Sequence, residues 1–513
     1  YEALTACGVK ARPDGWQGQP KVKSWGLERS VKSAGGLIAE ARVALNRTED
    51  GTPAARSTMI AAAARLKTWF ADRSDNSLAQ RAAGAAFLIR CVSAALVYGT
   101  QILLARWMGG FAFGVYVYVW TWVLLIGGLV DFGLSSAAQR FVPEYCKLSQ
   151  WDLLRGFLRG SRLITLALAT GVALLGAVVI WLCATAVDRF EVVPLYLAWA
   201  ALPFFALTRM QEGIARACNW INLALLPPYV IRSLILVALM AAGHAIGLGS
   251  DPTFAMAAAA LATAATAVAQ CLMLNRRLER QFAPGPKRYE VRKWFSTAIP
   301  IFMVEGFYLL LTYTDVLMLQ QFRPPEEVGV YYAAAKTLAL VAFVYFSVAA
   351  ATAPRFSEYH VTGDREKLAA FLANTIQWTF WPSLLATAVV LALGRHVLRL
   401  FGPHFVDGYP LLFILAVALL ARAAVGPAER LLNMVGEQRA CALVYATAFA
   451  VNVTACMGLI PFLGIRGAAI ATAIAVMTES TLLFVVTRRR LGLHACIWGS
   501  PVRIGAAGEP QWG

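Results

Sequence analysis

Apolar runs of twenty or more residues recur along most of this chain of 513 residues. A helix of about 20 residues spans a hydrocarbon core of roughly 30 Å, so each run is long enough to cross a membrane. Backbone groups in lipid must be hydrogen-bonded internally, which leaves helices or a closed barrel. Barrel strands alternate apolar and polar residues, and these runs do not alternate. The sequence therefore predicts an all-α polytopic membrane protein.

The membrane part repeats itself after about 215 residues. Gly114-Val-Tyr116 recurs as Gly329-Val-Tyr331, and Arg140-Phe-Val-Pro-Glu-Tyr145 recurs as Arg355-Phe-Ser-Glu-Tyr359. Because an internal repeat decides the architecture, we expect two similar halves. Further matches join Arg216 and Asn219 to Arg430 and Asn433, and Arg276-Arg277-Leu278 to Arg489-Arg490-Leu491.

Twelve spans fit the two halves, six in each. An even number gives both halves the same orientation, related by an axis along the membrane normal. We place the spans at 82–105, 112–136, 163–185, 192–208, 220–246, 252–275, 296–320, 328–353, 371–394, 408–421, 440–461 and 467–487. The predicted organisation is a basic N-terminal extension over 1–80, a first half over 81–280, a linker over 281–295, a second half over 296–491 and a tail over 492–513.

The cations are distributed unevenly between the two sides of these spans. The loops after even-numbered spans, together with the C-terminal tail, carry 24 Lys and Arg residues, against six in the opposite loops. Cytoplasmic loops carry such an excess in membrane proteins, so both termini are predicted to be cytoplasmic. The net charge of +17 follows from the same rule and does not indicate nucleic-acid binding.

Two basic segments flank or join the halves. Residues 1–80 are polar and have no continuous apolar stretch, so they are not a signal peptide. We expect a disordered cytoplasmic extension, within which 57–70 could form a short amphipathic helix on the membrane; Met59 is an alternative start, so residues 1–58 could lie outside the natural protein. The linker region 276–295 is basic and aromatic. It is expected either to lie near anionic head groups of the inner leaflet or to be a solvated connector.

Charged residues inside the predicted spans are the candidates for function. Each costs about 2.5–3.5 kcal/mol at mid-bilayer, so each needs a partner or a role. The alternatives to a transport role are a static ion pair between helices and a side chain that snorkels to the interface. The candidates are Arg90, Asp131, Arg232, Glu305, Asp315, Lys336 and Glu479.

A polar stripe runs along the seventh span. Glu305, Tyr308, Thr312 and Asp315 are spaced by three, four and three residues, which places them on one face of a helix. The other faces are mostly apolar, so the stripe should point away from lipid. A similar stripe in the first span consists of Arg90, Ser93 and Gln101.

The repeat relates some of these charges. Arg90 falls at the position of Glu305, and the two could pair in one conformation and separate in another. Arg232 and Lys336 lie deep in their spans. Together with Arg90 they could form a cationic chamber that binds phosphate oxygens through charge-assisted hydrogen bonds.

Several kinds of site are missing from the sequence. There is no Gly-x-x-x-x-Gly-Lys-Ser/Thr phosphate loop, and the Cys and His residues lack the spacing of metal or redox motifs. The predicted outer loops are too short to hold a catalytic site. We therefore expect a transporter without a built-in ATPase and without a metal or organic cofactor.

Particular motifs carry a family resemblance. They are Leu104-Ala-Arg-Trp-Met-Gly109, Phe113-Gly-Val-Tyr116, Asp131-Phe-Gly-Leu134, Arg140-Phe-Val-Pro143, Asp315-Val-Leu-Met318, Glu327-Val-Gly-Val-Tyr331 and Ala334-Ala-Lys336. Their order over about 85–490 resembles the polysaccharide-export branch of the MOP flippase superfamily, which holds the Wzx-type flippases of O-antigen and exopolysaccharide precursors. The MATE drug exporters and lipid II flippases are its relatives.

This resemblance implies two six-helix lobes in a V around a central cavity. It implies translocation of an undecaprenyl-pyrophosphate-linked oligosaccharide across the bacterial inner membrane by alternating access, driven by a proton or sodium gradient. Glu305 or Asp315, with Asp131, would couple the ion, while Arg90, Arg232 and Lys336 would bind the substrate beside Tyr308, Thr312 and Gln101. Expected partners are the lipid-linked oligosaccharide and anionic lipids, with a glycan polymerase and chain-length machinery as further candidates.

Two other functions compete with this interpretation. A MATE-like, ion-coupled exporter of cationic drugs would share the fold but needs an acidic, aromatic cavity. A membrane glycan polymerase or ligase needs a large outer loop with clustered Arg and His, which the sequence does not contain. No linear motif specifies the glycan, because sugars are held by dispersed polar contacts.

Overall fold

The computed structural model describes residues 75–183 and 188–497. The chain from Ile89 onward belongs to one compact unit and residues 75–88 belong to another. The expected extension up to residue 74, including the surface helix proposed over 57–70, lies outside the described residues. The last residues of the tail, from 498, also lie outside them. The contacts that build the fold and the site lie within the unit from Ile89 onward.

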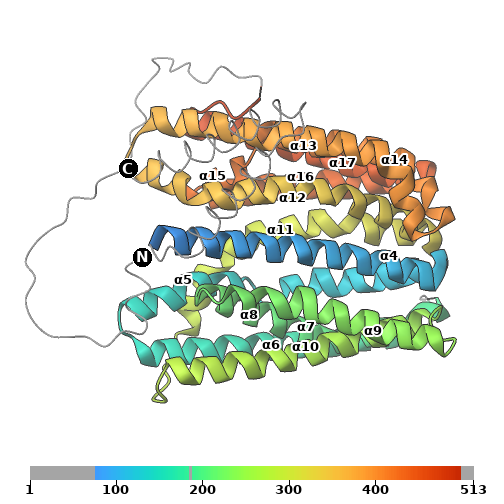
Figure 1. Ribbon diagram of the computed structural model, residues 1–513, viewed down its shortest axis with the longest axis horizontal. Helices are drawn as coiled ribbons and strands as arrows, with labels where there is room; N and C mark the ends of the chain where they lie inside the picture. Colours follow the sequence, from blue (N-terminus) through green and yellow to red (C-terminus); the bar gives the residue numbers. More distant parts are fainter. Residues whose placement is uncertain (1–74, 184–187, 498–513) are drawn as a thin grey trace, which may run out of the picture. The chain divides into compact units, whose positions relative to one another are not determined.

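The described chain is helical, and no strand occurs in these two ranges (Figure 1). The elements of the first half are α4 (Asp75–Leu129), α5 (Leu134–Lys147), α6 (Trp151–Leu182), α7 (Arg189–Ala217), α8 (Ile221–Leu225), the π-helix η1 (Leu226–Ile231), α9 (Arg232–Ala245) and α10 (Pro252–Gln281). Those of the second half are α11 (Val291–Phe322), α12 (Pro325–Val361), α13 (Arg365–Phe401), the 3-10 helix η2 (Pro403–Gly408), α14 (Tyr409–Val425), α15 (Ala428–Met434), α16 (Gln438–Leu463) and α17 (Ile465–Leu491).

The number of long apolar helices confirms the polytopic fold. Eleven segments of the described chain are long and apolar enough to cross a membrane. The first of them, Ile89–Lys147, contains Gly109 with φ 78° and ψ 178°, where α4 is interrupted by a kink. The residues on either side of Gly109 are the first and second predicted spans. With this division, the eleven segments correspond to the twelve spans expected from the sequence.

A capped turn separates α4 from α5. The carboxylate of Asp131 accepts hydrogen bonds from the backbone N–H of Gly133 at 3.1 Å and of Ser135 at 3.2 Å. Phe132 and Gly133 adopt left-handed conformations, with φ of 48° and 79°. These bonds satisfy N–H groups at the start of α5 that have no partner within the helix. Asp131, expected among the ion-coupling groups, thus has the contacts of a helix cap.

The linker between the halves lies on the first half. Arg155 of α6 donates hydrogen bonds to the carbonyls of Pro286 and Ala283, both at 3.0 Å. The backbone N–H of Arg288 donates to the carbonyl of Asp152, also at 3.0 Å. We call the side of the molecule that carries this linker the basic side.

Packing changes partners along α11. Trp294 and Ala298, near its start, are fully buried in the core of the first half. Val304 and Leu311 are buried in the core of the second half. Pro300 lies inside the helix between these two pairs, and a proline removes one hydrogen bond of the helix ladder. A single helix therefore joins the two cores across its proline.

The repeated Gly-Val-Tyr motifs pack against each other on the side opposite the basic side. A Cβ atom added at Gly114 would lie 1.7 Å from the carbonyl oxygen of Pro325. A Cβ atom added at Gly329 would lie 3.3 Å from the carbonyl oxygen of Gly110. The rings of Phe113 and Tyr332 are also neighbours, with centroids 6.3 Å apart. Glycine is required at the first of these positions because the two backbones touch.

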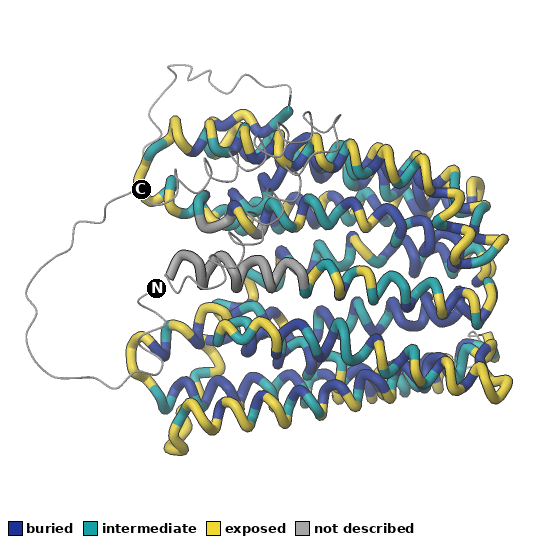
Figure 2. The backbone as a smooth tube through the Cα atoms, viewed as in Figure 1, coloured by how far each residue is buried: buried dark blue, intermediate teal, exposed yellow. Residues whose placement is uncertain are grey.

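Exposed residues recur along the helices as well as at their ends (Figure 2). Many of them are large and apolar, and Leu174, Trp181, Leu385 and Phe462 are each more than 60% exposed. Such surfaces are not stable in water over this length, but they match the hydrocarbon of a bilayer. The burial pattern therefore agrees with a protein whose outer surface contacts lipid.

Candidate functional site

A pocket lies within the first half, between the first, second, fifth and sixth spans. Its free space is about 340 Å³, part of which is open to solvent. Half of the ten lining residues are apolar or aromatic, and the others are one cation and four uncharged polar side chains. The lining residues are Val97, Thr100, Gln101, Tyr116, Trp120, Arg232, Ser233, Leu236, Ala259 and Thr263.

Arg232 is the charged group of this pocket. Its guanidinium carbon lies 5.5 Å from the ring centre of Trp120 and 5.9 Å from that of Phe205. Such positions over aromatic faces stabilise a cation. Within the described residues, no carboxylate forms an ion pair with Arg232. Gln101 lines the same pocket, and its buried Oε1 has no hydrogen-bond partner in that part of the chain.

Lys336 has a similar environment in the second half. Its Nζ lies 4.9 Å from the ring centre of Tyr332 and 6.0 Å from that of Tyr313. Tyr332 also interacts electrostatically with Arg232, so this tyrosine lies near both cations. No ion pair involves Lys336 in the described part of the chain. Two of the three cations predicted for the chamber are thus brought to one aromatic cluster.

The third predicted cation lies elsewhere. Arg90 is exposed, and it forms no ion pair with Glu305 in this conformation, although both residues lie in the described ranges. Glu305 instead accepts a hydrogen bond of 2.7 Å from the hydroxyl of Ser136 in α5. That bond joins α11 to the first half, so Glu305 holds the halves together without a cation in direct contact.

Asp315 is buried among helices of the second half. Its carboxylate accepts hydrogen bonds from the hydroxyls of Tyr331, at 2.5 Å, and Thr472, at 3.2 Å. The backbone N–H of Val316 donates a third, at 2.8 Å. Asp315 is thus buried and bound by three hydrogen-bond donors, two of them hydroxyl groups. The described residues contain no cluster of three His, Cys, Asp or Glu side chains that could hold a metal ion.

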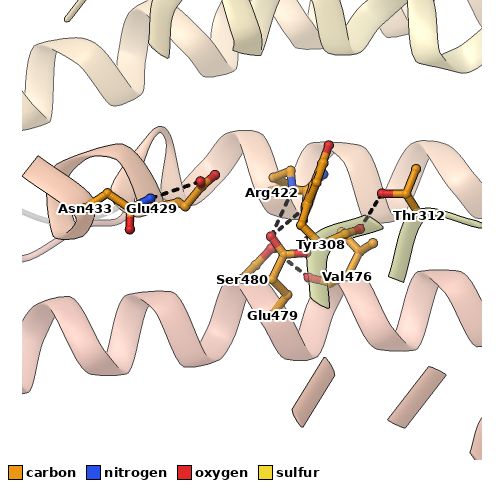
Figure 3. A network of polar contacts seen from close by, with 8 residues as sticks. All are labelled: Tyr308, Thr312, Arg422, Glu429, Asn433, Val476, Glu479 and Ser480. Carbon is orange, nitrogen blue, oxygen red and sulfur yellow. Dashed lines mark hydrogen bonds and ion pairs between the residues drawn. The ribbon is translucent and has the colours of Figure 1, made fainter. Parts of the chain in front are cut away.

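The remaining members of the seventh-span stripe lie beside an unpredicted ion pair (Figure 3). Arg422 of α14 donates to both carboxylate oxygens of Glu479 in α17, with two contacts of 2.6 Å. Its guanidinium carbon lies 5.6 Å from the ring centre of Tyr308. Thr312 donates its hydroxyl hydrogen to the carbonyl of Tyr308 at 2.7 Å. Glu479, predicted as a candidate charge, is 1% exposed and neutralised by Arg422.

The first half has an arginine in the place of Arg422. Arg209 of α7 precedes Arg422 by 213 residues, the same offset that relates Arg276 to Arg489. Thr266 corresponds to Glu479 under this offset, and its hydroxyl bonds to the carbonyl of Ala262 in its own helix. No hydrogen bond or ion pair reaches the Arg209 guanidinium within the described residues, and its buried Nε is unpartnered.

Neither arginine is among the candidates that the sequence provides. The predicted spans end at 208 and 421, one residue before each, which assigns both arginines to loops. The helices in fact continue to Ala217 and Val425. The repeat offset is the signal that could have found them, because it places an arginine at the same point of both halves.

Two protein-family models match the chain. The family model described as polysaccharide biosynthesis protein matches residues 81–360, and the model described as MatE matches residues 300–457. No curated protein matches the sequence.

Solved structures with the same fold are transporters and flippases. An inward-facing multidrug resistance MATE family transporter of the MOP superfamily is 18% identical, with a TM-score of 0.64 over 79% of this chain and 98% of its own. The lipid II flippase MurJ in an inward closed conformation is 14% identical, with a TM-score of 0.62 over 79% of this chain and 87% of its own. A MOP superfamily transporter from Pyrococcus furiosus is 17% identical, with a TM-score of 0.61 over 80% and 95%. These identities are low, so the likeness establishes the fold.

Proposed function

Because the chain belongs to the polysaccharide biosynthesis protein family of MOP superfamily membrane transporters, we propose that it translocates a polyprenyl-pyrophosphate-linked oligosaccharide across the bacterial inner membrane. The basic side would face the cytoplasm, where 24 of the cations of the membrane part and tail are predicted. The oligosaccharide would be a precursor of a surface polysaccharide.

The pair of cations near Tyr332 that form no ion pair in the described chain is the observation that carries this proposal. Arg232 and Lys336 contact aromatic faces, and no carboxylate of the described chain lies within ion-pair distance of either. Their acidic neighbours, Glu212 and Asp315, interact with them only at longer range. A cation that is left without a partner in a membrane protein is suited to receive an anionic ligand. A diphosphate offers several acceptor oxygens to guanidinium and ammonium donors. The tyrosine and tryptophan rings nearby could stack against sugar or prenyl groups.

The arrangement of charges favours this substrate over cationic drugs. In a drug exporter the free charges would be acidic, to attract a cation. Here Glu305, Asp315 and Glu479 are each hydrogen-bonded within the protein, while Arg232 and Lys336 form no ion pair in the described chain. The Pyrococcus furiosus transporter with the same fold is described as having reverse polarity of its binding pocket. The polarity of the pocket thus differs between proteins of this fold, and a basic pocket in this chain would be another such difference.

An enzymatic function has less support. A glycan polymerase or ligase needs a catalytic surface outside the membrane. The described connections opposite the basic side are short, such as 246–251 between α9 and α10 and 323–324 between α11 and α12. The structural neighbours are transporters and flippases.

Ion coupling is the second part of the proposal. Asp315 or Glu305 would bind a proton or a sodium ion, because each is an acidic side chain inside a span with hydroxyl neighbours. A membrane potential of 100 mV would supply about 2.3 kcal/mol for each charge moved. Asp315→Asn should remove the dependence of transport on the ion gradient, whereas a variant that keeps this dependence would place coupling elsewhere.

Deletion of the gene in its host, followed by complementation, tests the main proposal. We expect surface polysaccharide to disappear and lipid-linked repeat units to accumulate at the inner leaflet. The wild-type gene should restore export, and a gene that encodes both Arg232→Gln and Lys336→Gln should not. Intact polysaccharide together with increased sensitivity to cationic drugs would contradict the proposal and favour the exporter.

A further inference from the structure

We infer that Arg209 is a second anion-binding residue, which contacts the diphosphate on the basic side before it reaches Arg232 and Lys336. This inference rests on the proposed function and adds an entry point to it. It concerns a residue whose side chain forms no hydrogen bond or ion pair within the described chain.

Arg209 lacks the partner that its counterpart has. Arg422, at the corresponding position of the second half, is held by both oxygens of Glu479. In the first half, Thr266 is at the position that corresponds to Glu479, and its hydroxyl donates to a carbonyl of its own helix. No protein group accepts a hydrogen bond from Arg209 in the described chain, so its donors are left for a ligand.

The acidic groups near Arg209 are already engaged. Arg209 interacts electrostatically with Asp131, Glu212 and Glu305, but none approaches it within ion-pair distance. Asp131 accepts from the backbone of α5, and Glu305 accepts from Ser136. Glu212 pairs with Arg216 and accepts from the hydroxyl of Tyr229. Each acid is hydrogen-bonded elsewhere, so the donors of Arg209 remain unused, while Asp131 and Glu305, which form no ion pair in the described chain, offset part of its charge at longer range.

Arg209 also lies at a shallower depth than Arg232. It is eight residues before the end of α7 at Ala217, which is about 12 Å of helix from the basic side. Arg232 lies eleven residues after the start of α8 at Ile221, about 16 Å from the same side. Tyr229 interacts electrostatically with both arginines, so both lie near this residue. An anion that enters from the basic side would therefore reach Arg209 first.

The test measures binding of geranyl diphosphate, a short water-soluble prenyl diphosphate, to purified full-length protein in nanodiscs. Arg209→Gln removes the charge, Arg209→Lys keeps it, and Arg232→Gln removes the deeper cation. Arg140→Gln is the matched control, because Arg140 is an exposed cation on the same side with a side chain that is 66% exposed. Thermal unfolding of each variant reports whether the fold is retained.

We expect Arg209→Gln to raise the dissociation constant at least tenfold without lowering the unfolding temperature. Arg209→Lys should recover most of the affinity, which a purely structural role would not produce, and Arg140→Gln should bind like the wild type. Wild-type affinity in Arg209→Gln, with lost affinity in Arg232→Gln, would overturn the inference and leave the proposed function standing. Failure of the wild-type protein to bind the diphosphate would overturn both.

Discussion

Arg209 and Arg422 correspond under a repeat offset of 213 residues, yet their surroundings differ. Arg422 is bound by Glu479 and lies beside Tyr308, so its charge is neutralised inside the second half. Arg209 has Thr266 in place of that glutamate and, among the described residues, keeps an unpaired charge in the first half. The same difference extends to Arg232, which has aromatic neighbours and no ion pair in the described chain. The second half thus pairs Arg422 with an acid, whereas Arg209 and Arg232 of the first half form no ion pair in the described chain, as the proposed binding of an anion requires.

The largest effect should come from breaking the ion pair of the second half. Arg422→Met leaves the Glu479 carboxylate buried without a cation, and loss of one partner of a buried pair costs about 3–5 kcal/mol. Thermal unfolding in detergent should reveal this loss of stability, whereas Arg209→Met should unfold like the wild type.

The double variant Arg422→Met with Glu479→Leu is the control for this comparison. It removes both charges, and we expect it to recover most of the lost stability, because apolar replacement of a whole buried pair is often neutral. Equal unfolding temperatures for Arg422→Met and Arg209→Met would contradict the contrast between the halves.

The repeated glycines offer a second comparison. Gly114→Ala would place a methyl group 1.7 Å from the carbonyl oxygen of Pro325, whereas Gly329→Ala would place one 3.3 Å from that of Gly110. The first clash is with backbone and requires the two halves to separate on that side, whereas the second overlap is small enough to relax locally. We expect transport to fall at least tenfold in Gly114→Ala and to change by less than about threefold in Gly329→Ala, since the cost of overpacking grows with the overlap.

Labelling of single cysteines on the side opposite the basic side would measure this effect. A cysteine near Pro325 should react faster with an impermeant thiol reagent in Gly114→Ala, and not in Gly329→Ala. The same labelling rate in both variants would mean that the glycine contact does not close this side.

The smallest expected effect comes from making the first half resemble the second. Thr266→Glu introduces a carboxylate at the position of Glu479, where it could pair with Arg209. We expect its transport rate to be several-fold lower than that of Thr266→Gln, which has the same shape without the charge. A charge-assisted bond of about 1.5 kcal/mol would be enough for such a difference. Equal rates in the two variants would show that Arg209 does not act through its free charge.

The architecture is predictable from the sequence because the signals for it are local or periodic. Long apolar runs locate the twelve spans, and the Gly-Val-Tyr motifs locate the two halves. Arg232 and Lys336 stand out as charges deep in spans, and both are found beside Tyr332. Two of the predicted spans end one residue before Arg209 and Arg422, because each of the two is ended at its first cation. Both arginines are therefore assigned to loops and are not considered as candidates.

The pairing of charges could not be predicted in this way. Arg422 and Glu479 are 57 residues apart on different helices, and only packing brings them together. Pseudo-symmetry suggests that Arg90 could meet Glu305, but Arg90 is exposed and Glu305 binds Ser136 of α5. Asp131 is predicted to be an ion-coupling residue because it is a charge inside a span. In the structure its carboxylate accepts backbone hydrogen bonds from the left-handed turn that follows it. Partner choice is a long-range property, which neither spacing nor composition encodes.

The most direct test of the central claim is a transport assay in liposomes. Purified protein would be reconstituted with a fluorescent sugar linked to a prenyl diphosphate, and its movement between leaflets would be followed by quenching from outside. We expect the wild-type protein and Arg140→Gln to move this lipid, and Arg209→Gln and Arg232→Gln to move it at least tenfold more slowly. Unchanged movement in both variants, or movement of a cationic drug in place of the lipid, would contradict the claim that the free arginines of the first half receive the diphosphate.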